Sequence, residues 1–390
     1  MQIAVIALGI LIVYRVQALI YRRLWNKKLN VTIQFQKARV TEGEFVILEE
    51  ILENRKWLPL PVVFLQFKMS KAFRVPGERS KTSDDRYSRK ELMSVMMNQR
   101  LKRKVEVCCT RRGRYAIERA SIIAQSLFLD EQYTQELECG GRLTVYPRTV
   151  DAKRFELLLQ SISGGQVLRP FMQEDPFMNR GVREYQIYDS MKGINWNATA
   201  RTGSMKVNLL ETVSSRQAFV FLNIQKESLA VHNEVIEESI RLAKTFCVMF
   251  SKKGMKSCLY TNGTDGKNPE AICVEQGIGA EYISKVNEAL TQIFVDENGN
   301  ILTHGREQEL DFVSLYGEAM EHASEEGQVV LISGNQQESV LRLLKKLHRC
   351  GRQFLWLVPA ESQTFYKEDG ELKGHMRLWR LNFEGAGKRD

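Results

Sequence analysis

The first 21 residues constrain the fold most, because they form an almost uninterrupted apolar run. Residues 3–14 read IAVIALGILIVY, and RVQALIY extends the run to Tyr21. As a helix, residues 3–21 span about 28 Å at roughly 1.5 Å per residue, close to the thickness of a bilayer core. Arg15 interrupts the run, but its long side chain can reach an interface. We therefore predict a single membrane-spanning helix, with a buried or peripheral amphipathic helix as the alternative.

The flanks of this run distinguish an anchor from a secretory signal and set its orientation. A signal peptide needs a basic region before the apolar run and a small-residue cleavage site after it, whereas here MQ precedes and YRRLW follows. Positive charge follows the run at Arg22, Arg23, Lys27 and Lys28. We expect Tyr21 and Trp25 to be interfacial aromatics and the bulk of the chain to face the cytoplasm. Residues 1–28 are thus expected to be a cell-membrane anchor with a basic flank.

Net charge is concentrated in the same part of the chain. The formal charge is +9; residues 1–150 carry 27 Lys and Arg against 15 Asp and Glu, while residues 151–390 carry 29 against 32. An anionic membrane leaflet or a nucleic acid would both explain this excess. Aromatic residues for base stacking are sparse around the basic clusters, with Tyr115 the main candidate, so we expect no nucleic-acid partner. The seven cysteines form no C-x-x-C pair, which favours reduced thiols.

Two further regions differ in their hydrophobic pattern. Residues 29–146 contain short segments with period-two alternation, such as NVTIQFQKARV and RYAIERASIIA, separated by turn signals, which predicts an antiparallel β-sandwich. From residue 217 onward, buried strands such as QAFVFLNI and GQVVLISG alternate with amphipathic helices, which predicts an α/β domain over 217–390 with helices on both faces of a parallel sheet. Residues 147–216 link the two regions. The predicted fold class is therefore a multidomain α+β chain.

Catalytic and ligand-binding residues of an open α/β sheet are expected at the carboxyl ends of its strands. The first strand ends in FLNIQKES, which offers Asn223, Gln225 and Glu227. Two neutral amides make a poor ligand set for a hard cation, so we expect neither a metal nor a cofactor. The chain has no G-x-S-x-G, phosphate-binding glycine loop or H-E-x-x-H, and we expect its five scattered histidines to be solvated or structural.

The densest polar stretch is REYQIYDSMKGINWNATAR, residues 183–201. With Gly181 it resembles the signature of the domain-of-unknown-function 58 (DUF58) family, approximately G-x-R-x-Y-x-x-G-D-x-x-R-x-I-x-W-x-x-x-A-R. The matching residues are Gly181, Arg183, Tyr185, Asp189, Ile194, Trp196, Ala200 and Arg201. The chain departs from the pattern at Tyr188, Lys192 and Asn197. The resemblance extends to residues 42–61, 109–115 and 143–148, and so covers most of the chain.

The resemblance implies a role but no reaction. Members of this family commonly end in a Rossmann-like von Willebrand factor A-like domain, whose metal motif begins Asp-x-Ser-x-Ser; here Asn223, Gln225 and Glu227 make that motif degenerate. The family is linked with MoxR-type AAA+ ATPases and with transglutaminase-like membrane proteins, without an established enzymatic activity. The resemblance thus implies a membrane-associated scaffold or accessory protein that binds a protein partner without metal.

The motif residues leave two interpretations open. Arg183 and Arg201 can each bind a carboxylate through two hydrogen bonds, Asp189 is the nearest acid, and Trp196 is a large apolar anchor. These residues could form a clasp between the β and α/β domains, or an exposed groove in which Lys192 joins the arginines to bind an acidic peptide or phosphate. Two alternative functions also remain: a hydrolase centred on Asp189, and metal-dependent adhesion through the α/β domain.

Overall fold

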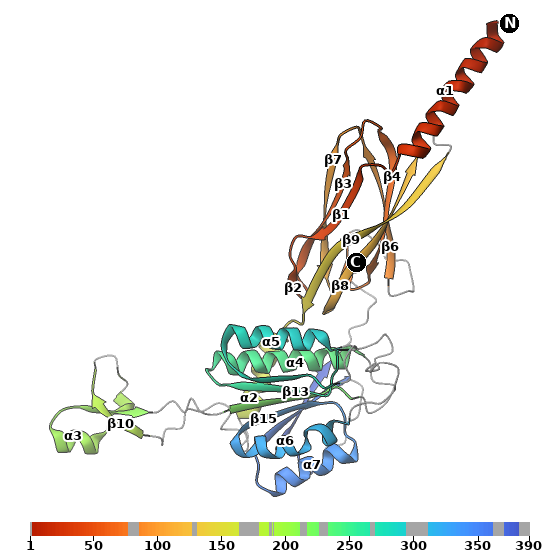
Figure 1. Ribbon diagram of the computed structural model, residues 1–390. Coiled ribbons are helices and arrows are strands. Elements are labelled where there is room, and N and C mark those ends of the chain that lie inside the picture. Colours follow the sequence, from red (N-terminus) through yellow and green to blue (C-terminus); the bar gives the residue numbers. More distant parts are fainter. Residues whose placement is uncertain are drawn as a thin grey trace. The chain divides into compact units, whose positions relative to one another are not determined.

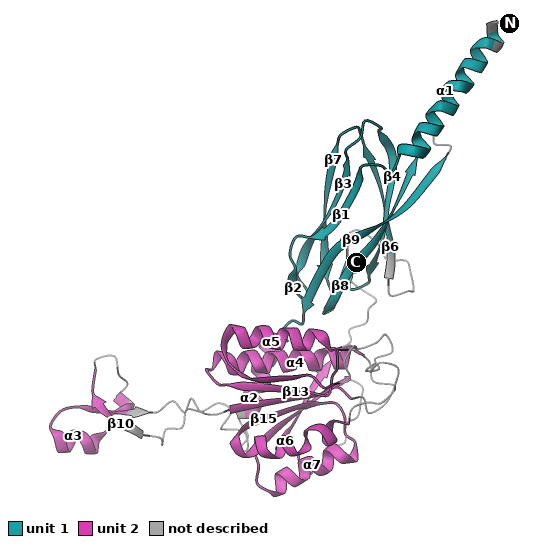
Figure 2. Cartoon of the chain, in the orientation of Figure 1, with its two compact units in different colours: residues 1–148 teal, residues 149–390 magenta. Residues whose placement is uncertain are grey.

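The computed structural model describes residues 2–76, 86–126, 131–163, 179–186, 189, 191–210, 217–225, 233–265, 270–293, 311–361 and 370–381. The chain divides into two compact units, residues 1–148 and residues 149–390 (Figure 2). The first unit holds one long helix and a β-sandwich, and the second is a mixed α/β unit. The expected combination of an apolar N-terminal helix, a β-sandwich and an α/β region is confirmed at this level.

Two sheets build the sandwich of the first unit (Figure 1). Its strands are β1 (Leu29–Phe35), β2 (Arg39–Thr41), β3 (Phe45–Asn54), β4 (Leu60–Ser70), β5 (Phe73–Arg74), β6 (Arg86–Val95), β7 (Arg100–Cys109), β8 (Gly113–Gln125) and β9 (Gln132–Tyr146). The sheet orders are β1-β3-β7-β5 and β2-β9-β8-β4-β6, and every pairing among these described strands is antiparallel except that of β2 with β9. This confirms the predicted sandwich, with β2 as its parallel exception.

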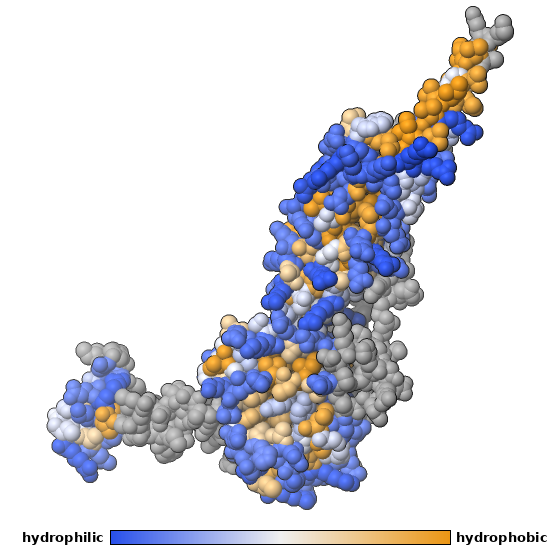
Figure 3. Space-filling model, viewed as in Figure 1, coloured by the Kyte–Doolittle hydropathy of each residue, from blue (hydrophilic) through white to orange (hydrophobic). Residues whose placement is uncertain are grey.

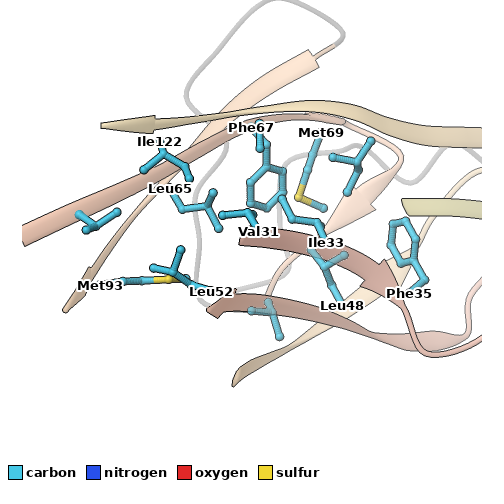
Figure 4. Packing of buried hydrophobic residues seen from close by; sticks show 14 of the residues in the cluster. Val31, Ile33, Phe35, Leu48, Leu52, Leu65, Phe67, Met69, Met93 and Ile122 are labelled. Carbon is cyan, nitrogen blue, oxygen red and sulfur yellow. The ribbon is translucent and has the colours of Figure 1, made fainter. Parts of the chain in front are cut away.

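The sandwich core follows from side-chain alternation along the strands. Val31 and Ile33 of β1 face Leu65 and Phe67 of β4 across the space between the sheets, with Leu48 of β3 beside them (Figure 4). Because successive side chains of a strand point to opposite faces, the residues between them remain toward solvent. One apolar residue in two is therefore sufficient to fill the space between two sheets.

Helix α1 (Gln2–Leu24) joins this core through its last turns. Val5–Leu24 has a mean hydropathy of 1.7 and is long and apolar enough to cross a membrane, with 6% of its most apolar stretch buried. Tyr21 and Trp25, however, are buried in the sandwich cluster. The expectation that these two residues are interfacial aromatics is therefore wrong, because each finds an apolar neighbour and a polar partner inside the sandwich.

The second unit has a six-stranded sheet in the order β14-β13-β12-β15-β16-β17. These strands are β12 (Gln217–Asn223), β13 (Ser257–Thr261), β14 (Cys273–Gly277), β15 (Gly327–Ser333), β16 (Phe354–Glu361) and β17 (Met376–Leu381). All pairings in it are parallel except that of β14 with β13. The predicted parallel sheet is confirmed, and the structure adds an antiparallel edge strand, β14, that its sequence pattern did not indicate.

Helices cover both faces of this sheet, as expected (Figure 1). Helices α2 (Ala152–Ser163), α4 (Asn233–Lys252) and α5 (Gly279–Gln292) share one apolar cluster, and α6 (Phe312–Glu326) and α7 (Glu338–Arg349) share another. Along β12, Val220 and Leu222 belong to the first cluster and Phe219 and Phe221 to the second. A strand covered on both faces is apolar at every position, which explains why QAFVFLN lacks alternation.

The remaining described part of this unit is the motif hairpin, residues 179–210. Strands β10 (Asn179–Glu184) and β11 (Lys206–Leu210) pair antiparallel, and a 3-10 helix, η2 (Met191–Gly193), and helix α3 (Trp196–Thr202) lie between them. This hairpin carries all the residues that resemble the DUF58 signature.

Candidate functional site

An ion pair fixes the first half of the motif hairpin. Arg183 Nη1 and Nη2 donate to Asp189 Oδ2 and Oδ1, both at 2.6 Å, and the Gln186 N–H donates to Asp189 Oδ2 at 2.8 Å. The Arg183 hydrogen bonds, followed by the Gln186 backbone bond, hold the pKa of Asp189 below its usual value. The carboxylate is therefore ionised at neutral pH and both its oxygens accept hydrogen bonds, which suits a positioning role better than proton transfer.

Helix α3 is tied to β11 by short polar side chains. Asn195 caps the helix by accepting from the Ala198 N–H at 2.9 Å, and its Nδ2 donates to Asn208 Oδ1 at 2.7 Å. The Lys206 N–H donates to Thr199 Oγ1 at 3.0 Å. These bonds join residues far apart along the hairpin, so the segment from residue 194 to residue 208 has a defined local structure.

The other motif residues fall into buried and exposed groups. Ile194 is buried and forms an isolated bridge with Val207, and the Tyr185 N–H donates to Met205 O at 2.9 Å. Gly181 lies in β10 opposite Leu209, beside a register shift. Trp196 is 64% exposed, and Ala200 and Arg201 are exposed on α3. The structure therefore brings Arg183 and Asp189 together and places Arg201 on the surface.

An exposed apolar group accompanies Trp196 on this hairpin. Met191 is 69% exposed, and Met205 and Val182 are each 43% exposed. Of the positions that depart from the family pattern, Asn197 is exposed, Tyr188 lies outside the described residues, and the side chain of Lys192 is likewise not described. The choice between a clasp and a ligand site remains a prediction.

Amide side chains occupy the carboxyl edge of the α/β sheet. Asn223, at the end of β12, is buried, and its Nδ2 donates to Ser333 Oγ at 3.1 Å. Asn223 Oδ1 accepts from Asn262 Nδ2 and from the Gln225 N–H, each at 3.0 Å. Asn262 Oδ1 in turn accepts from the Ile224 N–H at 3.0 Å. The ends of β12, β13 and β15 are thus joined by one hydrogen-bond network, which we call the amide network (Asn223, Asn262 and Ser333).

The three side chains of the amide network are neutral, and Asp265, which follows Thr264, is a described acid after β13. Thr264 Oγ1, Asn335 Nδ2 and Gln225 Oε1 are buried there without a hydrogen-bond partner. The described part of the chain holds no cluster of three or more His, Cys, Asp or Glu side chains, while Glu227 lies outside it. Neutral amides and hydroxyls are weak ligands for hard divalent cations, which prefer carboxylates.

The structure also brings together two histidines that the sequence separates. His348 Nδ1 lies 3.0 Å from His375 Nε2, and His375 Nδ1 lies 3.0 Å from Phe354 O. A carbonyl only accepts, so His375 carries its proton on Nδ1 when neutral, and its Nε2 accepts from His348. Burial is the largest influence on His375 and lowers its pKa, while the hydrogen bond to Phe354 O acts in the opposite direction. Their separation of 27 residues gave no signal of this contact.

Comparison with known proteins identifies no family. No family model matches the chain, and no curated protein matches it. Similar solved structures include a CARDB domain from Pyrococcus furiosus (14% identity, 28% of this chain and 91% of that one, TM-score 0.18) and the seventh ScaB type I cohesin from Pseudobacteroides cellulosolvens (14%, 31% and 94%, TM-score 0.20). A non-cellulosomal cohesin from Archaeoglobus fulgidus has 9% identity over 33% of this chain and 97% of that one, with a TM-score of 0.20. These TM-scores are too low to support a conclusion about function.

Proposed function

We propose that the chain is a membrane-anchored scaffold or accessory protein of the DUF58 type, which binds a protein partner through its motif hairpin. In this proposal helix α1 anchors the chain, and the basic residues that follow it favour a cytoplasmic location for the rest. The α/β unit serves in this proposal as a von Willebrand factor A-like domain. The partner that the resemblance implies is a MoxR-type AAA+ ATPase, with a transglutaminase-like membrane protein as a further member of the assembly.

The observation that carries the proposal is the exposed Trp196 on a hairpin held by defined contacts. Tryptophan and methionine are enriched in the cores of protein interfaces, and Met191 and Met205 accompany Trp196 on this hairpin. Because the Arg183–Asp189 pair and the bonds of Asn195 already order the segment, binding there loses little conformational entropy.

The amide network supports binding without metal. In a metal-dependent adhesion site, carboxylates converge and need a cation to offset their mutual repulsion. Here Asn223 and Asn262 hydrogen-bond to one another, so these two side chains have no mutual repulsion for an ion to offset. Recognition in this proposal therefore relies on direct protein contacts.

Co-purification of the full chain from detergent-solubilised membranes of its own cell tests this function. The MoxR-type ATPase is identified and quantified by mass spectrometry, with and without EDTA. We expect wild-type chain to retain the ATPase in EDTA and Trp196→Ser to retain roughly 30-fold less, since an interface hot spot contributes about 2 kcal/mol or more. Leu315→Ser is the matched control, because Leu315 is an exposed apolar residue of α6.

Two results would contradict the proposal. One is recovery of the wild-type chain without the ATPase. The other is equal recovery of the ATPase with Trp196→Ser and with wild-type chain, which would remove the hairpin as the binding surface. Loss of the ATPase in EDTA alone would instead favour metal-dependent adhesion.

A further inference from the structure

The end of the sandwich from which α1 emerges is built from two loops that a buried asparagine holds together (Figure 1). These are the β3–β4 loop, residues 55–59, and the β6–β7 loop, residues 96–99. Asn54, fully buried, donates from Nδ2 to Leu58 O and to Met96 O, both at 2.9 Å. The Asn98 N–H donates to Lys56 O at 3.0 Å. The two loops therefore form one surface, which we call the helix end of the sandwich.

Helix α1 is attached to this surface without a linker. Tyr21 Oη donates to Pro59 O at 2.7 Å, Lys56 Nζ donates to Trp25 O, and the Arg55 N–H donates to Lys28 O at 3.0 Å. The Trp25 ring stacks on Tyr133 of β9 with centroids 5.6 Å apart. The helix and the sandwich are thus one body at this point, and the position of one fixes that of the other.

Large apolar side chains are exposed on the helix end. Trp57 is 61% exposed, and Met96 and Met97, at the start of the other loop, are 54% and 59% exposed. Leu19, the last strongly exposed apolar residue of α1, precedes the buried Trp25 by six residues. Helix α1 rises about 7.5 Å from Leu19 to its end at Leu24, comparable with one headgroup layer of about 5–8 Å, so these loops lie at headgroup depth in a bilayer whose hydrocarbon core ends near Leu19.

The charge of this end is mostly basic, although Glu53 pairs with Arg55 at 2.9 Å and Glu131 accepts from Tyr133 Oη. The side chains of Arg22, Arg23, Lys27 and Lys28 are exposed. Residues 1–41 contain no Asp or Glu, and neither do residues 55–59 or 96–99. Figure 3 shows the contrast along α1, where apolar side chains give way to hydrophilic ones at its junction with the sandwich. Such a pattern complements an anionic lipid headgroup layer.

We propose that the helix end of the sandwich is a second membrane-contact surface, with Trp57, Met96 and Met97 seated in the interfacial layer of an anionic bilayer. This rests on the proposed anchoring by α1. Indole and thioether side chains suit the boundary between headgroups and acyl chains, and the adjacent basic residues bind the lipid phosphates. The contact holds the sandwich against the bilayer at a fixed orientation, rather than letting it tilt about the helix.

Tryptophan quenching in liposomes tests the contact. The full chain is reconstituted into phosphatidylcholine/phosphatidylglycerol vesicles containing lipids brominated near the headgroup. We expect Trp57→Phe to lower the quenched emission by at least about twofold relative to wild type, because Trp57 is exposed at this end whereas Trp25 is buried in the sandwich. The difference should shrink in pure phosphatidylcholine vesicles.

A matched reporter lies at the other end of the same strand. Phe45, 53% exposed, begins β3, whereas Asn54 ends it about 30 Å away at roughly 3.3 Å per residue. Phe45→Trp in the Trp57→Phe background should therefore not restore quenching. Restored quenching, or equal quenching of wild type and Trp57→Phe, overturns the inference.

Flotation after an alkaline carbonate wash separates this inference from the anchoring on which it rests. A chain that floats with the vesicles but shows no Trp57 quenching overturns the second contact alone. A chain that carbonate releases from the vesicles overturns the anchor, and the second contact with it.

Discussion

The amide network makes a quantitative prediction for Asn262→Leu, a substitution that keeps the same branched arrangement of four side-chain heavy atoms at a position 1% exposed. The change removes the acceptor of the buried Ile224 N–H and the donor to Asn223 Oδ1. Leaving a buried N–H without its acceptor costs about 1–3 kcal/mol. Asn223 Oδ1 keeps the Gln225 N–H, so its loss is that of a single net hydrogen bond, about 0.5–1.5 kcal/mol.

Together these losses are about 1.5–4.5 kcal/mol, and they act where β12 and β13 end. Hydrogen exchange of the full chain in detergent measures this locally, because it reports the opening free energy of each peptide. At about 1.4 kcal/mol per tenfold, protection of peptides from β12 and β13 should fall roughly 10- to 2,000-fold. Peptides from the sandwich should be unchanged, because they belong to the other compact unit.

Asn287→Leu is the matched control in the same unit. Its Oδ1 lies buried on α5 without a hydrogen-bond partner, so an apolar replacement should change protection by less than about threefold. A loss below threefold for Asn262→Leu, or equal losses for both variants, would refute the view that the amide network stabilises this edge.

Two further predictions concern buried rings. Because burial lowers the pKa of His375, folding favours the neutral form of its ring. The contribution of this ring to stability is complete above about pH 6.5 and declines as the pH falls toward the pKa of the folded state. Hydrogen exchange of peptides covering residues 372–381 should accelerate between pH 7.5 and 5.5, after correction for intrinsic rates. The control His322→Asn, at an exposed site, should leave that pH profile unchanged. A flat profile for the wild-type chain would contradict the prediction. Trp25→Ala should destabilise the sandwich by about 3–5 kcal/mol, whereas Trp57→Ala in detergent should destabilise it by less than about 0.5 kcal/mol. Denaturant-dependent hydrogen exchange of the sandwich strands measures both losses. Equal losses would show that the end of α1 is not part of the sandwich core.

Much of the fold follows from local hydrophobic pattern, and the incompletely predicted strands have a common origin. The local sequence pattern identifies strands covered on both faces, such as β12 and β15, and amphipathic helices such as α4. The edge strand β14 reads CVEQG and has no clear period, and β6 begins with RYSRK, which has no apolar alternation. Edge strands need few buried residues, so the pattern that identifies a strand is weakest there.

The position of the last turns of α1 could not be predicted for a different reason. A basic flank with tyrosine and tryptophan is typical of a membrane interface, and the same residue types also fill a protein core. Only the tertiary contacts of Tyr21 with Pro59 and of Trp25 with Tyr133 distinguish the two. The side-chain types predicted the chemistry of these residues but not their partners.

The candidate sites show the same division between local and non-local information. Arg183 and Asp189 are six residues apart, and complementary charge was sufficient to suggest their pairing. Asn262 was missed because it becomes a neighbour of Asn223 only when β13 pairs with β12 in the observed register. Polar residues that follow different parallel strands form a site only through strand order, which a single sequence does not specify.

The amide network and the exposed Trp196 together constrain how such a scaffold could bind. The three side chains of the amide network are neutral and hydrogen-bond to one another, so they gain little electrostatic free energy from a cation. In the proposed function, affinity must then come from apolar burial at the hairpin, which depends weakly on salt, whereas binding of the helix end to anionic lipid depends strongly on it. Raising the ionic strength should therefore weaken the lipid contact of Trp57 before it weakens the partner contact of Trp196, and the opposite order would be inconsistent with the assignment of these two surfaces.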